Sequence, residues 1–144
     1  MFNFYRTSNR IKKHEGFKNK IYKDLLGNLT IGYGHLIRNK DSFKPNTKYS
    51  KKILSLVFKK DLEKAIFHFK KNYRTKNIPT NIQEVIIEMI FQLGIKNVLD
   101  FKKFNTHIYN QKYFLASFEM VKSRWYSQTP KRADKLINFL LNKQ

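Results

Sequence analysis

The sequence contains no cysteine, which excludes a disulfide framework and a cysteine-ligated zinc site. Acidic residues are also scarce: ten Asp and Glu stand against thirty Lys and Arg, so the formal net charge is +20. No run of about 18 consecutive apolar residues occurs, and the first residues, MFNFYRTSNRIKK, lack the apolar stretch of a signal peptide. We therefore expect no membrane span and no export signal.

The chain does have enough apolar residues for a real core. It has 144 residues, of which 41% are hydrophobic and 15% aromatic, and this fits one compact domain or two lobes that share a helix. The positive charge favours a polyanionic partner, whether nucleic acid, anionic lipid or a cell-wall polymer. The abundance of Lys, Asn, Ile, Phe and Tyr also fits AT-rich coding, which would enrich lysine without selection for binding. The charge therefore indicates a class of partner and no particular one.

The first half of the chain predicts a helix, a small sheet and a second, longer helix. Residues 4–14 can form a short helix, and residues 18–36 carry short β-type runs interrupted by a tight turn at Gly27. A polar connection leads to Ser50, which we expect to be a helix N-cap. Apolar residues then recur at intervals of three and four, which predicts one amphipathic helix over residues 50–73.

The second half predicts helices alone. The segment NIQEVIIEMIFQLG is apolar on nearly every face, so we expect a buried central helix that ends at Gly94. Shorter helices should follow, and the last should begin with Thr129 as N-cap and Pro130 in the first turn. The predicted fold class is α+β, with a small antiparallel sheet lobe and a larger helical lobe joined by the long helix. The expected single domain, 1–144, has these parts: sheet lobe 15–49, connecting helix 50–73, and helical lobe 74–144 with the N-terminal helix packed on it.

Three residues near the predicted sheet have side chains suited to hydrolysis of a glycosidic bond. That reaction needs an acid for the leaving oxygen and a second group that holds water on the other face of the sugar. Glu15 at a helix end and Asp24 at a strand end could supply the two carboxyl groups, and the Thr30 hydroxyl could bind the water. Taken singly, each residue also fits an ordinary structural role: a helix-end counter-ion, a turn aspartate and a strand threonine.

The spacing of the three residues resembles the catalytic region of the T-even phage lysozymes, glycoside hydrolase family 24. They are embedded in EG…IYKD…TIGYGH, and the resemblance extends to FKKDLEKA, EMIFQLG and KSRWYSQTPKRADKLI, which covers most of the chain. It implies a lysozyme-like fold with Glu15 as general acid. Asp24 and Thr30 are implied to position the attacking water, and hydrolysis is expected to invert the anomeric centre. No metal and no organic cofactor is expected.

The resemblance also implies roles for residues outside the catalytic three. His35 is expected to form a structural ion pair with Asp61. Trp125 and Tyr126 lie in a helical apolar pattern, so we expect them in the core. Family positions that contact the substrate correspond to these residues: Leu36, Phe91, Gln92, Phe104, Glu119 and Arg132. Phe104 and Glu119 replace a serine and an asparagine of the phage enzyme, and Arg132 is expected beside Glu15.

The expected function is a muramidase that cuts the β-1,4 bond between N-acetylmuramic acid and N-acetylglucosamine and so lyses bacteria. Its expected partners are peptidoglycan glycan strands and anionic cell-envelope polymers, with no specific nucleic acid, and we expect a monomer. As a phage endolysin it would wait in the host cytoplasm until a holin opened the way to the periplasm and wall. Two other origins also fit the sequence, namely a tail-associated lysozyme and a gene captured by a bacterium. The alternative function is a catalytically weak, basic protein that binds cell wall or nucleic acid.

Overall fold

The computed structural model describes residues 1–142, which divide into two compact units. Residues 8–64 form a sheet unit, and residues 1–7 together with residues 65–142 form a helical unit. Helix α1 (Phe4–Glu15) and helix α2 (Lys51–Asn72) each contribute residues to both units. The α+β fold class predicted from the sequence, with a small antiparallel sheet among helices, is confirmed. The single domain with its stated limits stays a prediction.

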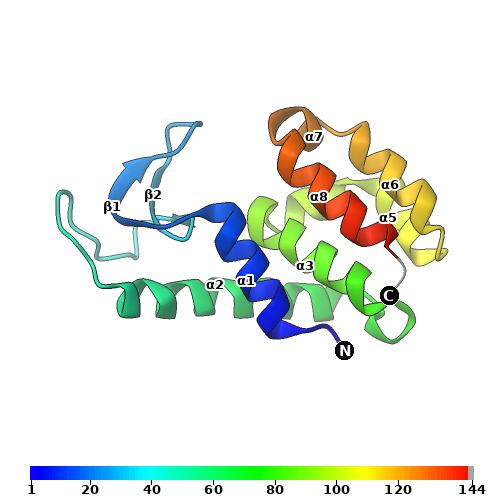
Figure 1. The fold of residues 1–144 in the computed structure, drawn as a ribbon, viewed down its shortest axis with the longest axis horizontal. Helices are drawn as coiled ribbons and strands as arrows, with labels where there is room; N and C mark the ends of the chain where they lie inside the picture. The colour runs from blue at the N-terminus through cyan, green and yellow to red at the C-terminus, as the bar shows by residue number, and fades with distance from the viewer. Residues whose placement is uncertain (143–144) are drawn as a thin grey trace. The chain divides into compact units, whose positions relative to one another are not determined.

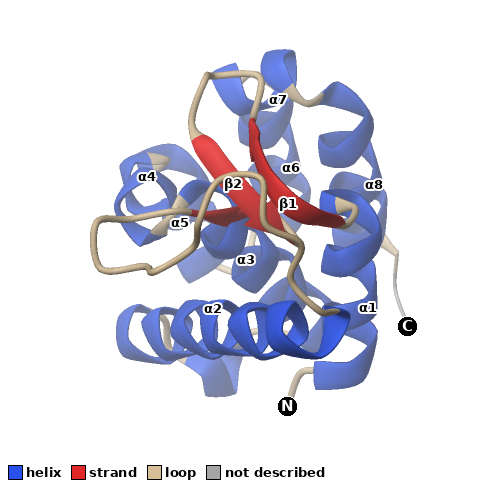
Figure 2. Ribbon diagram, turned by 90° about the vertical axis from the view of Figure 1, so that its left-hand side faces the viewer, coloured by secondary structure: helices blue, strands red, loops and turns tan. Residues whose placement is uncertain are grey.

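The sheet unit contains a three-stranded antiparallel sheet, drawn in red in Figure 2. Its strands are β1 (Lys18–Lys23), β2 (Leu29–Gly32) and β3 (His35–Leu36), in the order β1-β2-β3. A register shift interrupts the pairing of β1 with β2 between Lys18 and Tyr22. Beyond it, Tyr22 pairs with Thr30. The sheet therefore fixes which side chains lie opposite one another next to the β1–β2 turn.

A compact apolar core holds the sheet on its helices. Tyr33, just after β2, makes ring contacts with Phe17 and Phe58 at centroid distances of 4.9 Å and 5.4 Å. Ser50 starts α2 as expected, because its Oγ accepts a hydrogen bond from the Ile53 amide at 3.2 Å. The buried apolar residues of this unit are Ile11, Ile31, Tyr33, Leu54, Phe58 and Leu62.

The helical unit is built around α3 (Thr80–Leu93), the predicted central helix, whose residues from Ile82 to Ile90 are all buried. Figure 1 shows the shorter helices of this unit packed together, and α3 contacts both α4 and α8. Gly94 ends α3 as expected, with a φ of 81°. The other elements of the unit are the 3-10 helix η1 (Thr75–Asn77), α4 (Ile95–Asp100), α5 (Lys102–Tyr109), α6 (Tyr113–Val121), α7 (Arg124–Gln128) and α8 (Pro130–Leu141).

Two buried acids sit in α3, a feature that its apolar sequence pattern does not predict. Glu84 and Glu88 are both 0% exposed. Arg6 donates two hydrogen bonds to Glu84, at 2.7 Å and 3.1 Å, and the Asn3 amide adds a third at 2.9 Å. A buried charge is tolerated only where such partners replace water. The Arg6–Glu84 pair therefore joins the start of α1 to α3 inside the helical unit.

The structure corrects one detail at the ends of the last helices. Thr129 occupies the N-cap position of α8, and Pro130 is in the first turn, but the Thr129 side chain does not cap the helix. Its hydroxyl donates instead to the Trp125 carbonyl at 3.2 Å. Side-chain capping occurs one helix earlier, where Ser123 Oγ accepts from the Tyr126 amide at 3.1 Å and starts α7.

Candidate active site

Glu15 is the last residue of α1, and it stands where the chain turns from the helix into the sheet. Gly16 makes this turn: its amide donates to the Lys12 carbonyl at 3.0 Å, and its φ is 69°, in the left-handed region that glycine adopts without strain. The Glu15 side chain is half-buried. The end of the helix therefore presents a carboxyl group at the sheet instead of continuing into a further turn.

The Glu15 carboxyl group packs directly against the backbone of Gly34, in the turn between β2 and β3. A Cβ built on Gly34 would lie 2.9 Å from the Glu15 carboxyl carbon and closer still to one of its oxygens. Gly34 also has a φ of 75°. Glycine is thus required here for two reasons, the backbone conformation and the space taken by Glu15.

Asp24 is held rigidly by the turn between β1 and β2. Its Oδ1 accepts from the amides of Leu26 and Asn28, at 2.9 Å and 2.8 Å, and its Oδ2 accepts from the Asn28 side-chain amide at 3.3 Å. The hydrogen bond from the Asn28 amide makes the largest contribution to lowering the pKa of Asp24. The turn therefore keeps Asp24 as a fixed, ionised carboxylate.

Thr30 follows this turn on β2, and its side chain is buried with 4% exposure. Its hydroxyl donates to the Asn28 carbonyl at 3.1 Å. A hydroxyl that donates its hydrogen retains lone pairs that accept from another donor, such as water. Asn28 thus bonds to both Asp24 and Thr30, and this shared partner sets their relative placement.

Tyr22 is a residue of this site that the sequence analysis missed. It lies on β1, two residues before Asp24, and pairs with Thr30 across the sheet. Burial raises the pKa of its phenol, and the negative charges of Glu15 and Asp24 raise it further. The phenol therefore lies within electrostatic reach of both carboxyl groups. Finding Tyr22 from the sequence would have required the register between β1 and β2, and that register shifts between Lys18 and Tyr22.

His35 lies between two carboxylates. Its Nδ1 is 2.7 Å from Asp61 Oδ2 on α2, the contact expected from the sequence, and its Nε2 is 3.1 Å from Asp41 Oδ2. The hydrogen bond with Asp61 is the main cause of the raised pKa of His35, and burial opposes it. Only the doubly protonated imidazolium donates from both ring nitrogens, so this arrangement favours the charged form.

Asp41 was not predicted, and it connects His35 to the loop that precedes α2. The same Asp41 oxygen also accepts from the Arg38 amide at 2.7 Å. The Phe43 ring packs edge-on against His35, with centroids 6.0 Å apart, and against Tyr49 at 5.0 Å. The loop is therefore fastened at its middle to the end of the sheet. Nothing in its polar sequence singles out Asp41 from the other loop residues.

In the helical unit, two of the predicted site residues form hydrogen bonds with buried neighbours. Arg132 Nε donates to the buried Glu88 at 3.2 Å, and the Arg132 side chain is only 12% exposed. Gln92 accepts from the Trp125 indole at 3.0 Å. Trp125 is 3% exposed, so its predicted core position is correct. Tyr126 is half-buried and donates to Asp134 at 2.7 Å, so it is not a core residue.

The remaining predicted substrate contacts differ in their availability to a ligand. Leu36 on β3 is 44% exposed, and Phe91 is half-buried. The Glu119 side chain is 18% exposed and accepts from Lys122 at 2.8 Å, the hydrogen bond that does most to lower its pKa. Phe104, by contrast, is 0% exposed and packs edge-on against Phe101. The Phe104 side chain therefore belongs to the core and offers no surface to a glycan.

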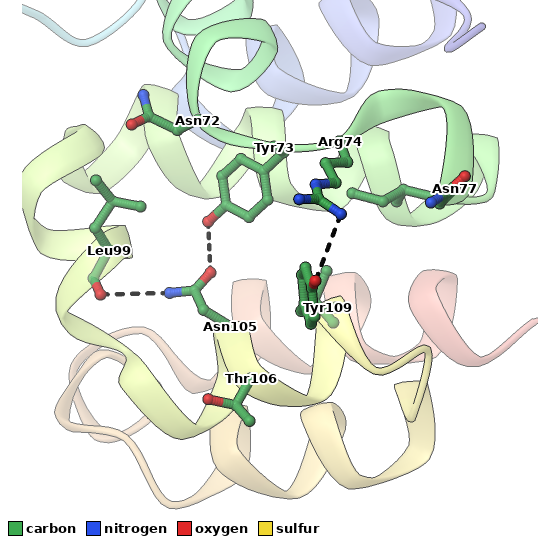
Figure 3. Close-up of a pocket in the computed structure, with 10 residues that line it drawn as sticks. Asn72, Tyr73, Arg74, Asn77, Leu99, Asn105, Thr106 and Tyr109 are labelled. Carbon is green, nitrogen blue, oxygen red and sulfur yellow. Dashed lines mark hydrogen bonds between the residues drawn. The ribbon is translucent and has the colours of Figure 1, made fainter.

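A hollow of about 570 Å³ in the helical unit contains none of the predicted site residues. Figure 3 shows that Tyr73 and Arg74, after α2, face Asn105 and Tyr109 of α5 across it. Tyr73 donates to Asn105 at 2.6 Å, and Asn105 donates in turn to the carbonyls of α4 residues. Several of the polar groups that line the hollow are therefore engaged with one another. Among residues 1–142, no three His, Asp or Glu side chains are grouped closely enough to hold a metal ion.

Comparison with known proteins identifies the family of the chain. Residues 12–138 match the family model described as phage lysozyme. The chain belongs to the phage lysozyme family. Two relatives in Dictyostelium discoideum carry the names probable T4-type lysozyme 2 and probable T4-type lysozyme 1. The first is 34% identical over an alignment that covers 89% of each chain, and the second is 33% identical over 90% of each chain.

Family membership gives the site its enzymatic class. The chain is a glycoside hydrolase of the lysozyme type. The matched range includes Glu15, Asp24 and Thr30, which all lie in the sheet unit. No helix among the described residues is both long and apolar enough to cross a membrane.

Proposed function

We propose that this lysozyme cuts the β-1,4 bond between N-acetylmuramic acid and N-acetylglucosamine in peptidoglycan, with inversion at the anomeric carbon. The observation that carries the proposal is the β1–β2 turn. Its amides fix Asp24 as an ionised carboxylate, and Thr30 shares the Asn28 anchor with it, in the same unit as Glu15. This is the arrangement needed to hold a water molecule and to supply a proton from a separate carboxyl group.

In the proposed reaction, the Glu15 carboxylic acid donates its proton to the glycosidic oxygen as the bond from this oxygen to the anomeric carbon breaks. A water held by Asp24 and Thr30 attacks the anomeric carbon from the opposite face of the sugar and gives up one proton to Asp24. The products are two shorter glycans, one of which has a new reducing end in the α configuration. Exchange with solvent then returns a proton to Glu15 and removes one from Asp24.

Tyr22 is proposed to assist Glu15 as the acid and Asp24 as the base. Its half-buried phenol lies within the field of both Glu15 and Asp24. A phenol is neutral at physiological pH, and the raised pKa of Tyr22 moves its ionisation further from that range. A neutral phenol donates a hydrogen bond without adding a third negative charge to the site. Gly34 is proposed to position Glu15, because the carboxyl group packs against its backbone.

The glycan contacts are proposed on the exposed or half-buried residues of the predicted set, namely Leu36, Phe91, Gln92, Arg132 and Glu119. Glu88 orients Arg132, and Trp125 orients Gln92, through the hydrogen bonds described above. The excess of lysine is proposed to attract the enzyme to anionic cell-envelope polymers. Host-cell lysis as an endolysin, with release from the cytoplasm by a holin, is the proposed biological role of a monomeric enzyme.

Binding of nucleic acid is a weaker explanation of the same sequence. It would need the aromatic residues of the lysine-rich helix α2 on its exposed face, where bases could stack on them. Phe58 and Phe69 are instead 3% and 0% exposed. Phe67, at 61%, is an exposed exception. The aromatic residues of α2 therefore pack mainly into the core.

The proposed function is tested with Glu15→Gln, which keeps the size of the side chain and removes the acid. The assay is clearing of outer-membrane-permeabilised Gram-negative cells, with mass spectrometry of the released glycans. Glu63→Gln is the matched control, because Glu63 is an exposed acid of α2 whose ion pair with Lys59 is long, at 3.9 Å. We expect Glu15→Gln to fold and to lose clearing, while Glu63→Gln keeps it.

Undiminished clearing by folded Glu15→Gln would refute the role of Glu15. Mass spectrometry adds a separate check on the reaction, since hydrolysis yields reducing ends that contain one added water. Products that lack this water would show that the enzyme acts as a transglycosylase, and the water-holding role of Asp24 and Thr30 would then be wrong.

A further inference from the structure

Helix α6 carries large apolar side chains on its solvent-exposed side, although the same helix also packs into the core. Its buried side consists of Ala116, Ser117 and Met120. Figure 1 shows α6 beside α5 in the helical unit. Four side chains on the other side form what we call the α6 apolar face: Phe114 is 63% exposed, Leu115 42%, Phe118 51% and Val121 46%.

The α6 apolar face is continuous along the helix. Phe114, Phe118 and Val121 are spaced by four and three residues, so they follow one another on one side of successive turns. The rings of Phe114 and Phe118 are in contact, with centroids 5.1 Å apart. Single exposed apolar residues are normal on a protein surface, but contiguous ones indicate an interaction site.

Basic residues border this face. Lys112 and Lys122 flank the two ends of α6. The acid of the helix, Glu119, is engaged by Lys122 at 2.8 Å and also lies in the fields of Lys103 and His107. The surroundings of the apolar side chains are therefore positive, in a chain whose formal net charge is +20.

We propose that the α6 apolar face docks on the surface of an anionic phospholipid bilayer. Helices that lie in the plane of a membrane interface place Phe and Leu side chains among the acyl chains and keep Lys at the level of the phosphates. Phe114, Leu115, Phe118 and Val121 meet the first requirement. Lys112 and Lys122 meet the second, because both are exposed at the ends of the helix and a long lysine side chain can keep its charge at the level of the phosphates.

The size and charge of the surface favour a bilayer over a second copy of the chain. A stable dimer buries about 800 Å² on each partner. Four partly exposed side chains on a nine-residue helix supply far less. A second copy would also bring its own positive charge against Lys112 and Lys122. A shallow apolar contact surrounded by lysine instead fits the interface of an anionic lipid layer.

The test is binding of the full chain to sedimented vesicles, either of phosphatidylglycerol and phosphatidylethanolamine or of phosphatidylcholine alone, at about 0.1 M salt. We expect Phe114→Ser/Phe118→Ser to lower the partition coefficient on anionic vesicles by about tenfold or more, since two exposed rings no longer insert. Phe67→Ser is the matched control, because Phe67 is 61% exposed on α2, and it should bind like the parent chain. Phosphatidylcholine vesicles should bind the parent chain more weakly.

A second variant reports insertion directly. Phe118→Trp places an indole on the α6 apolar face, while the native Trp125 is buried and gives a constant background. Addition of anionic vesicles should shift the emission of the new indole to the blue, and brominated lipids should quench it. Lack of both effects would overturn the proposal, as would unchanged binding by Phe114→Ser/Phe118→Ser, since charge alone would then account for binding.

Light scattering of the protein without lipid tests whether a second copy of the chain binds the α6 apolar face instead. A dimer that is lost in Phe114→Ser/Phe118→Ser would assign the α6 apolar face to a second copy of the chain and would also overturn the proposal. All of these readouts measure binding, so they are independent of the proposed glycan cleavage.

Discussion

Replacement of Gly34 by alanine tests whether the packing of Glu15 against the β2–β3 turn matters for catalysis. A left-handed backbone costs a residue with a Cβ about 1–2 kcal/mol, and the restricted unfolded chain returns about 0.4–1 kcal/mol of this. The new methyl group would also lie 2.9 Å from the Glu15 carboxyl carbon, so either the side chain or the turn must move. Gly27→Ala is the matched control, because Gly27 has a φ of 82° and nothing within 4 Å of an added Cβ. Gly27 supports the turn that holds Asp24 only through its backbone amide, which alanine retains.

We expect both variants to lose about 1 kcal/mol of stability from the backbone, a fall of about 3–5 °C in Tm, and Gly34→Ala to lose more because of the steric conflict. Clearing of permeabilised cells should fall by at least about 100-fold in Gly34→Ala, which is the lower range for loss of a positioned acid. Gly27→Ala should keep most of its activity at a temperature where both are folded. Equal activity of the two folded variants would refute the positioning role of Gly34.

Three more predictions concern the site and the charge. Asp24→Asn should lower clearing by at least about 100-fold because it removes the base. Thr30→Ala should lower clearing by about tenfold, the value of one hydrogen bond to water. The reverse order of the two variants in initial rates would contradict these roles. The stability that His35 contributes should be complete below about pH 6.5 and should fade as pH rises through its raised folded pKa. An NMR titration should show that Asp41→Asn lowers the pKa of His35. An unshifted pKa of His35 in the parent chain would argue against its contacts with the two carboxylates. Clearing of whole cells should pass through an optimum in salt concentration, because the Debye length falls from about 10 Å at 0.1 M to about 3 Å at 1 M. Cleavage of a neutral chitooligosaccharide should change little over the same range. Equal salt dependence for both substrates would place the effect of charge in the site itself.

Most of the secondary structure follows from local signals in the sequence. The amphipathic spacing of α2, the Ser50 cap and the stop at Gly94 are each set by a few neighbouring residues, and the structure has all three. The acids of α3 could not be found in this way. Glu84 and Glu88 look like ordinary interruptions of an apolar helix, and their burial depends on Arg6 and Arg132, which are distant in sequence.

The same limit applies to the candidate site. Glu15, Asp24 and Thr30 were named from the chemistry of their side chains and from a resemblance to the catalytic region of a known family. The roles of Tyr22 and Asp41 depend instead on strand register and on the path of a loop. Phe104 was assigned to the glycan by correspondence with a family position, but a large ring at that position is buried in the core. A correspondence in sequence conveys where a residue lies along the chain, and burial decides whether it can meet a ligand.

The anomeric configuration of the first product tests the central claim most directly, namely that a water held by Asp24 and Thr30 attacks while Glu15 protonates the leaving oxygen. Proton NMR of a short peptidoglycan glycan, recorded before mutarotation, distinguishes the two anomers of the new reducing end. The account predicts the α anomer, because the water attacks the face opposite the broken β bond. A first product in the β configuration would contradict it and would assign Asp24 a different part in the reaction.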